Sequence, residues 1–429
     1  MDPLGPGLAV DPDATLLFCG FVGGGVALGT VSGLTPGIHA NTFALLLAGV
    51  APSIPGPVRY VGAAMLAAGV VHTFLDVVPA LALGVPDPAM ASSALPGHRL
   101  VLAGRGREAL RLSALGSAGA VAFAVPLAVP MTSAMTAVYP TLRAHLPLLL
   151  GVVVVVLVVT ESTTVGRVGA ALSVAASGAL GAVALDLPPG GLVESGGMLA
   201  PIFTGLFGAP VLLDALTGEG VPPQDDANVT ASRRSVVGFA LAGTLSGAVV
   251  GYVPGVSSAI AATVALLAVP GGGDGWGDGS GSPSGGGADG ARGFVVTTSG
   301  VNTANTVFAL LALIALGTPR TGVMVAMRDA GVPLDLPLLL GSVLVAAACG
   351  FALVVTLGDS YLRLVGRADY TRLSVSVLCL VVVVVAVLTG PLGVAVLGGS
   401  TVVGLVPARF GARRASLMGV LLVPLIFGL

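Results

Sequence analysis

His72 and Asp76 are the residues most able to carry chemistry in this sequence, because both are ionisable and both lie inside the apolar stretch 60–84. Residues four apart share one face of a helix, so the imidazole and the carboxylate point the same way near the middle of the stretch. Ionisable groups inside a membrane are costly, and they usually face a hydrated cavity or take part in ion or proton coupling. A mutually neutralised structural pair is the alternative interpretation.

A second polar group lies in the corresponding part of the other half of the chain. The sequence contains four asparagines, and three of them lie in apolar surroundings beside repeated motifs. The group comprises Asn302, Thr303, Asn305 and Thr306. Their neutral oxygens are hard ligands of the kind that a sodium ion accepts together with unwound backbone carbonyls. We therefore expect His72, Asp76 and this group to bind a coupling ion, either sodium or a proton.

Two Pro-Gly pairs, Pro36-Gly37 and Pro254-Gly255, interrupt the apolar stretches of the two halves. Proline removes a backbone donor and glycine lets the chain leave helical geometry, so each pair should end one half-helix and start another. The amides freed at the new helix starts carry partial positive charge, and they can bind a carboxylate or another small anion. The sequence therefore predicts a substrate site between the two breaks.

Polar side chains follow both breaks. They are His39, Asn41 and Thr42 after the first break, and Ser257 and Ser258 after the second. Such side chains can bind a carboxylate together with the free amides. The alternative is that they cap the starts of their own helices.

An internal repeat relates these features. Residues 20–37 align with residues 238–255 with identical residues at eight positions, and the segment that starts at His72-Thr73 aligns with the segment that starts at Asn305-Thr306. Two repeats that are interrupted at the same place are typical of a secondary transporter whose site lies at the repeat interface. The aligned glycines are expected to allow close helix packing instead of forming a site. These are Gly25, Gly29 and Gly33 in the first half, and Gly243, Gly247 and Gly251 in the second.

The composition predicts an all-α polytopic membrane protein and excludes several other classes. Of the 429 residues 55% are hydrophobic and 9% are charged, with a mean hydropathy of +1.02. The formal net charge is −2 and lysine is absent, so no basic face exists for nucleic acid. The sequence shows no nucleophile elbow, phosphate-binding loop, zinc-ligand spacing or paired carboxylates. We therefore expect no catalytic residues, no metal site and no cofactor other than the coupling ion.

About twelve transmembrane helices are expected when the chain is read in stretches of about 20 apolar residues. The expected spans are 14–35, 60–84, 113–130, 146–164, 168–187, 196–216, 235–253, 293–317, 336–358, 370–389, 391–408 and 413–429. Two shorter apolar stretches, 38–52 and 256–269, favour half-helices or re-entrant segments.

These spans divide the chain into two halves. We expect an N-terminal tail (1–13), a first transmembrane repeat (14–216), an inter-repeat loop (217–234) and a second repeat (235–429). A flexible loop rich in Gly, Ser and Asp (271–291) is inserted in the second repeat. The polar stretch 85–112 carries four arginines and Glu108, and the positive-inside rule places it in the cytoplasm. Glu161, Asp186 and Asp214 end apolar runs, which favours interfacial positions over functional ones.

Several ordered motifs resemble one family. They include GLTPGIHANT (33–42), HTFLDVVPALALGVPD (72–87), LAPIFTGLFGAP (199–210), GYVPGVSSA (251–259) and SGVNTANTVFALLALIALGTPRTG (299–322). In these motifs the chain resembles the archaeal form of the TctA family, the large permease subunit of the tripartite tricarboxylate transporters. The resemblance implies ion-driven uptake of a tri- or dicarboxylate such as citrate across the cytoplasmic membrane. It also implies two partners, a small four-helix membrane subunit and an extracytoplasmic solute-binding protein.

The leading hypothesis is thus a multi-pass carboxylate symporter. A partner-independent exchanger of another solute is the first alternative. A non-transporting membrane scaffold, in which His72 and Asp76 only hold helices together, is the second. A membrane enzyme would need a solvent-facing cluster of acid, base or metal ligands, which the sequence does not show.

Overall fold

The computed structural model describes residues 11–36, 54–83, 94–192, 197–216, 221–226, 228–253, 258, 261, 265 and 286–429. Within these residues the chain is helical and contains no strand. Eight helices in this part of the chain are long and apolar enough to cross a membrane, and three shorter apolar helices accompany them. The prediction of an all-α polytopic membrane protein is therefore confirmed.

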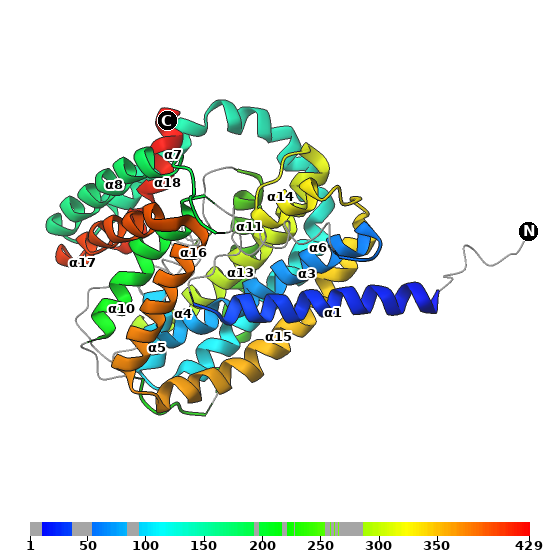
Figure 1. Cartoon of the computed structure of the whole chain (residues 1–429), viewed down its shortest axis with the longest axis horizontal. Helices are drawn as coiled ribbons and strands as arrows, with labels where there is room; N and C mark the ends of the chain where they lie inside the picture. The colour runs from blue at the N-terminus through cyan, green and yellow to red at the C-terminus, as the bar shows by residue number, and fades with distance from the viewer. Residues whose placement is uncertain are drawn as a thin grey trace, which may run out of the picture.

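Figure 1 shows the helices in their chain order. They are α1 (Pro12–Leu34), α3 (Val58–Leu75), α4 (Val77–Leu83), α5 (Ala94–Leu102), α6 (Gly106–Ala144), α7 (Leu146–Val159), α8 (Thr164–Ala184), α9 (Leu199–Phe203), α10 (Ala209–Ala215), α11 (Arg233–Tyr252), α13 (Gly286–Leu316), α14 (Gly322–Asp329), α15 (Leu336–Arg367), α16 (Tyr370–Gly404), α17 (Val406–Arg409) and α18 (Gly419–Phe427). A π-helical turn (Thr204–Gly208) joins α9 to α10, and a 3-10 helix (Arg414–Met418) precedes α18.

The glycines of α1 bring its backbone against α3. They meet α3 in the same order along both helices: Gly25 lies against Ala64, Gly29 against Ala68 and Gly33 against Leu75. The two helices therefore run parallel, and Leu34 and Val58 lie at opposite ends of the pair. A Cβ at Gly33 would lie 2.8 Å from the Cβ of Leu75, so only glycine permits this approach.

The same arrangement recurs between α11 and α13. Gly243 lies against Thr297, Gly247 against Ala304 and Gly251 against Phe308, again in parallel order. A Cβ at Gly251 would lie 2.8 Å from the Cβ of Phe308, which repeats the contact between Gly33 and Leu75. The expectation that the aligned glycines serve close packing is confirmed in both halves.

The chain runs in opposite directions in the two glycine-packed helix pairs. Thr73 contacts Thr303, Asp76 contacts Asn302, and further along α4 and α13 Leu81 and Val295 both lie against Gly97. Residue numbers therefore rise along α3 and α4 in the direction in which they fall along α13, so α3 and α13 run antiparallel. The most apolar window of the segment Val58–Leu83 is wholly buried, and that of α13 is 78% buried. This inverted arrangement places the two central helices in contact at mid-length.

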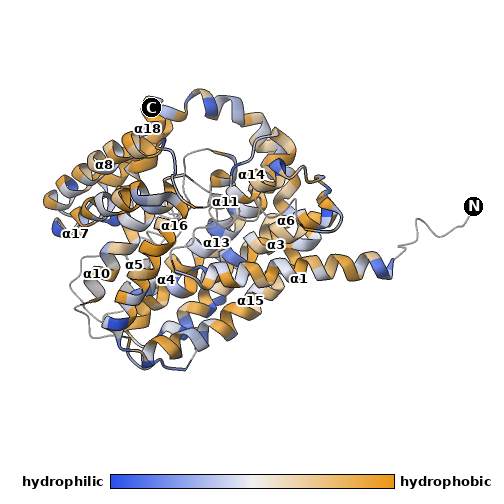
Figure 2. Ribbon diagram, in the orientation of Figure 1, coloured by the Kyte–Doolittle hydropathy of each residue, from blue (hydrophilic) through white to orange (hydrophobic). Residues whose placement is uncertain are grey.

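Other helices surround this centre. The helices α6 and α15 pack on α3 and α13, whereas α7, α8, α9 and α18 form a second apolar cluster around Ile202, Leu206 and Met418. Figure 2 shows hydrophobic residues along the lengths of α1 and α15, where Leu16, Val31 and Leu344 have exposed side chains. Exposed apolar side chains along spans of this length are suited to contact with lipid.

Seven of the twelve expected spans are confirmed, and five differ. The stretches 146–164, 196–216 and 413–429 form helices too short to cross a bilayer alone. The expected spans 370–389 and 391–408 form one helical run that is kinked at Gly390, with φ 71° and ψ −168°. The kink has a clear cause, because Pro391 lacks an N–H and its ring clashes with the preceding turn. Two of the carbonyls beside the kink accept hydrogen bonds from residues 190 and 192.

Two expected loops are partly helical. The stretch 85–112 contains α5 and the start of α6, and the stretch 271–291 contains the start of α13 at Gly286. In both places charged or glycine-rich residues, which favour a loop, form the start of a helix. Most of the shorter stretches 38–52 and 256–269 lies outside the described residues. The division of the chain into domains stays a prediction.

Candidate ion-coupling site

Asp76 is the single turn residue between α3 and α4. Asp76 follows the last residue of α3, and its backbone N–H donates to the carbonyl of His72 over 2.9 Å. Pro79, the third residue of α4, has no N–H to offer to the carbonyl of Leu75, and its ring crowds that carbonyl. Pro79 therefore explains why the helix is interrupted here, inside a segment of 26 residues that is long enough to span a membrane.

The Asp76 carboxylate meets Asn302 of α13. Nδ2 of Asn302 donates to Oδ2 of Asp76 over 2.7 Å, and both side chains are only 4% exposed. A hydrogen bond to an ionised group is stronger than one between neutral groups. This contact joins the two halves of the chain across the interface of the inverted helix pairs.

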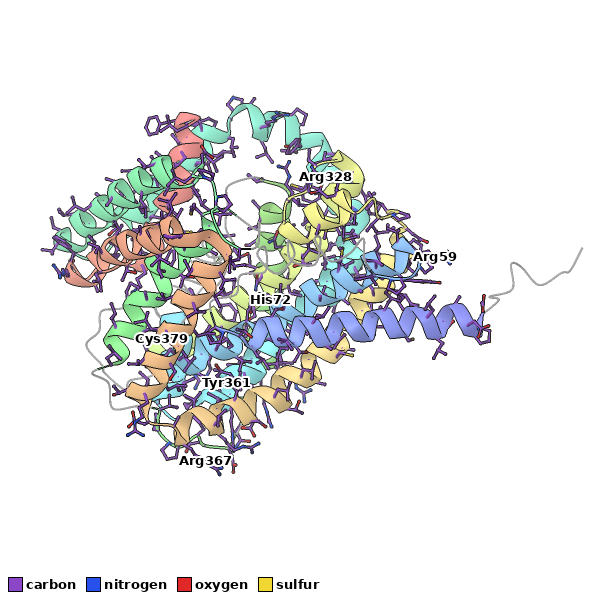
Figure 3. All side chains as sticks on the ribbon, viewed as in Figure 1. Arg59, His72, Arg328, Tyr361, Arg367 and Cys379 are labelled. Carbon is purple, nitrogen blue, oxygen red and sulfur yellow. The ribbon has the colours of Figure 1, made fainter. Side chains whose placement is uncertain are left out.

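The His72 imidazole contacts α1. Its Nδ1 lies 2.9 Å from Oγ of Ser32, and the Ser32 hydroxyl also lies 3.2 Å from the carbonyl of Gly29. If the hydroxyl donates to that carbonyl, it accepts from a protonated Nδ1; if it donates to Nδ1, the other tautomer is present. Either tautomer therefore keeps Ser32 as a partner, and the imidazole is only 1% exposed. Figure 3 places His72 at the middle of the molecule, with Arg59 and Arg328 toward one end and Arg367 toward the other.

A pair of threonines completes the contact between the halves. Oγ1 of Thr73 lies 3.2 Å from Oγ1 of Thr303, and both side chains are buried. Thr73 also donates to the carbonyl of Val70 over 2.8 Å, so its oxygen retains a lone pair for Thr303. Two hydroxyl groups, a carboxylate and an amide N–H therefore meet where the central helices cross.

The remaining expected site residues are placed as follows. Asn305 is half-buried and Thr306 is buried on α13, within one turn of Asn302 and Thr303. Pro36 lies just after the end of α1, close to the Asp76 turn, because an added Cβ on Gly33 would be 3.3 Å from the Asp76 nitrogen. Ser258 is 3% exposed. The others lie outside the described residues: Gly37, His39, Asn41, Thr42, Pro254, Gly255 and Ser257.

Sequence reasoning missed a buried charge cluster around Glu108. The Glu108 side chain is 2% exposed and accepts from Nε of Arg292 over 3.0 Å. Arg105 lies 2.6 Å away, and the backbone N–H of Thr230 donates over 3.0 Å. The acidic residue also lies in the first turn of α6, where the helix dipole favours it. The sequence position of Glu108 at a helix start favours an acidic residue there, but it does not indicate that the side chain is buried.

A second buried ion pair joins Glu161 to Arg413 over 2.8 Å, and the backbone N–H of Arg413 donates to the same carboxylate over 3.0 Å. Glu161 is 5% exposed and follows the end of α7. The pair ties α7 to the segment before α18. This contact agrees with a structural role for Glu161, although the side chain is more buried than an interfacial position suggests.

The fold and the site define a class of protein: a multi-pass membrane protein with inverted helix pairs and buried polar residues at their crossing. The family comparison identifies that class more closely. Residues 19–419 match the model of the tripartite tricarboxylate transporter TctA family, and the chain belongs to that family.

The family is one of transporters. A similar protein is an uncharacterized protein of Methanocaldococcus jannaschii, which is 25% identical over 410 residues that cover 94% of this chain and 96% of the relative. No solved structure matches the chain. The resemblance seen in the sequence motifs is thereby confirmed.

Proposed function

We propose that this protein is the permease of a secondary transporter that moves a small tri- or dicarboxylate, such as citrate, across the cytoplasmic membrane with a sodium or proton gradient. The observation that supports the proposal most is the contact between Asp76 and Asn302 at a helix break. It lies where inverted helix pairs cross, in a chain of a transporter family. Intramembrane carboxylates in such positions serve ion coupling more often than packing.

The coupling chemistry follows from the groups that meet at the crossing. Sodium is a hard cation that prefers oxygen ligands, and the crossing offers the Asp76 carboxylate together with the hydroxyls of Thr73 and Thr303. The carbonyl of Leu75, which Pro79 cannot engage, is a further oxygen of the same kind. A proton would instead be carried by Asp76 or by His72. Both ions fit the residues, and transport measurements distinguish them.

We place the substrate between the helix starts expected at Gly37 and Gly255, with His39, Asn41, Thr42, Ser257 and Ser258 beside it. Support comes from the end of α1, which lies next to the Asp76 turn. An anion bound just beyond α1 would be close to an ion held at Asp76, and opposite charges at short range stabilise one another. This proximity would couple the two binding events.

The family description names a tripartite system. We therefore propose that the permease works with a small four-helix membrane subunit and an extracytoplasmic solute-binding protein. A partner-independent exchanger is the alternative within transport. Uptake by the purified chain alone would favour the alternative, whereas uptake that requires the two added partners would favour the tripartite system.

A membrane scaffold is the second candidate, because His72 and Asp76 both form hydrogen bonds that could serve stability alone. The two functions predict different results for Asp76→Asn. If Asp76 couples transport, this variant folds but loses gradient-driven uptake. If Asp76 only holds α3 against α13, the variant is less stable, and neither the native protein nor the variant transports citrate.

The experiment is uptake of labelled citrate into liposomes that contain the purified protein, with and without the two partners, under an imposed sodium or proton gradient. Asp186→Asn is the matched control, since Asp186 is an exposed carboxylate at the end of an apolar helix. We expect uptake with one gradient, loss in Asp76→Asn and normal uptake in Asp186→Asn. Absence of gradient-driven uptake of any di- or tricarboxylate would refute the transport proposal.

A further inference from the structure

A cavity of about 520 Å³ lies between the start of α6 and the end of α15, away from the crossing of the central helices. Its polar lining includes Arg107 and Arg111 from α6 and Arg363 from α15. Asp359 and Asp226 also line it. Three guanidinium groups from two neighbouring helices therefore converge on one space.

The two carboxylates differ in how firmly the arginines hold them. Asp359 is engaged on both sides, 2.6 Å from Nε of Arg107 and 3.0 Å from Nη1 of Arg363. Asp226 lies 3.9 Å from Arg107 with a side chain that is 96% exposed, so water screens it and it can turn away. An incoming anion could replace Asp226 beside Arg107 while Asp359 keeps the arginines in place.

The cavity has apolar walls on the side toward the membrane. Leu110 and Val355 line it, and the same helix faces continue with exposed apolar side chains. Leu115, one turn beyond Arg111, is 36% exposed, and Phe351, one turn before Val355, is 37% exposed. The arginines therefore lie at one end of a row of exposed apolar side chains, Leu115 and Phe351, which we call the apolar track.

The cavity lies at the arginine-rich end of the molecule, which also carries Arg233, Arg234, Arg367 and Arg372 at helix ends. The positive-inside rule assigns such an end to the cytoplasmic side. Basic pockets between transmembrane helices on this side are suited to anionic lipid headgroups. Both α6 and α15 are long enough to span the membrane, so the cavity lies at the level of the headgroups.

We propose that this cavity binds the phosphate headgroup of an anionic phospholipid whose acyl chains lie along α6 and α15. Arg107, Arg111 and Arg363 bind the phosphate, since guanidinium groups match phosphate oxygens in charge and geometry. Leu115 and Phe351 contact the chains. A free phosphate ion shares the headgroup chemistry but would gain nothing from the apolar track.

The test compares two charge-matched double variants of the full chain in detergent. Arg111→Gln with Arg363→Gln removes two arginines from the cavity, and both side chains are exposed, so folding should be unaffected. Arg367→Gln with Arg372→Gln removes two exposed arginines from the same end of the molecule but outside the cavity. The probes are dihexanoyl phosphatidylglycerol, dihexanoyl phosphatidylcholine and inorganic phosphate, and the readout is the concentration that gives half of the maximal thermal stabilisation.

We expect phosphatidylglycerol to stabilise the native chain at lower concentration than either other probe. Each arginine near an anionic lipid contributes roughly fivefold in affinity, so the cavity variant should need roughly 25-fold more phosphatidylglycerol. The control variant should behave like the native chain. Equal losses in both double variants, or none in the cavity variant, would overturn the assignment. Equal stabilisation by inorganic phosphate and phosphatidylglycerol would overturn the lipid as the ligand.

Discussion

Two neighbouring glycines of α1 should respond to the same substitution with opposite signs. Gly25 is buried against the backbone of Ala64, and a Cβ there would lie within the contact distance of the Ala64 carbonyl. Gly24 is exposed, and a Cβ there would meet no other atom within 4 Å. Gly24→Ala and Gly25→Ala therefore differ only in what the added methyl group touches.

The magnitude follows from two opposing contributions. Replacing glycine by alanine inside a helix stabilises it by up to about 1 kcal/mol, and this gain is common to both variants. Overpacking costs about 1–3 kcal/mol, and the cost at Gly25 should approach the upper limit because the obstacle is backbone. We expect Gly24→Ala to be neutral or stabilising and Gly25→Ala to be destabilising by about 1–2 kcal/mol. Their difference isolates the packing cost.

Thermal unfolding in detergent, followed by circular dichroism, measures this difference, which should be on the order of 5 °C. The second half provides an independent comparison. A Cβ at Gly247 would lie 2.6 Å from the Cβ of Ala304, whereas a Cβ at Gly238 would meet nothing within 4 Å. Gly247→Ala and Gly238→Ala should therefore repeat the result. Equal melting temperatures within each pair would refute the close parallel packing of α1 on α3 and of α11 on α13.

Three further outcomes are expected. Arg292→Met should destabilise the protein by about 3–5 kcal/mol, because it leaves the buried Glu108 carboxylate with fewer partners. Adding Glu108→Gln should recover much of the lost stability, as measured by thermal unfolding. Burial lowers the pKa of the His98 imidazole, and its 2.6 Å hydrogen bond to the carbonyl of Leu81 opposes this shift. The melting temperature should therefore fall as the pH drops below about 6.5, the usual pKa of histidine in an unfolded chain. His98→Gln should remove that part of the pH dependence. Pro79→Ala should raise thermal stability by joining α3 to α4 but reduce gradient-driven uptake, and unchanged uptake would contradict a role for the helix break.

The periodic features of the sequence predicted the long helices well. A span of about 20 apolar residues is a local property, so α1, α3, α11, α13 and α15 were visible without tertiary information. The close helix packing was equally predictable, because glycines spaced four residues apart leave one helix face without side chains, and such a face is typical of a helix contact. Short helices such as α7 and α18 were overestimated, since an apolar stretch buried among other helices has the same composition as one that crosses the membrane.

The contact between Asp76 and Asn302 could not be predicted from the sequence, and the function of the site stays a prediction. His72, Asp76 and Asn302 stood out as polar residues in apolar stretches, but the hydrogen bond between Asp76 and Asn302 depends on how α3 and α13 cross. Sequence reasoning expected a helix break at Pro36-Gly37, of which Gly37 lies outside the described residues, and it overlooked Pro79, which lies beside the Asp76 turn. The burial of Glu108 could not be inferred, because its partner Arg292 is far away along the chain.

The opposed directions of α3 and α13 constrain how the chain is threaded. Because successive traverses of the membrane alternate in direction, helices at equivalent positions of two copies can point oppositely only if an even number of traverses lies between them. Adding or deleting a single traverse between them would turn the second copy over. The Asp76 turn would then be moved away from Asn302, even though every local sequence motif remained intact. The parity of the first half is therefore as essential to the contact as the two side chains that form it.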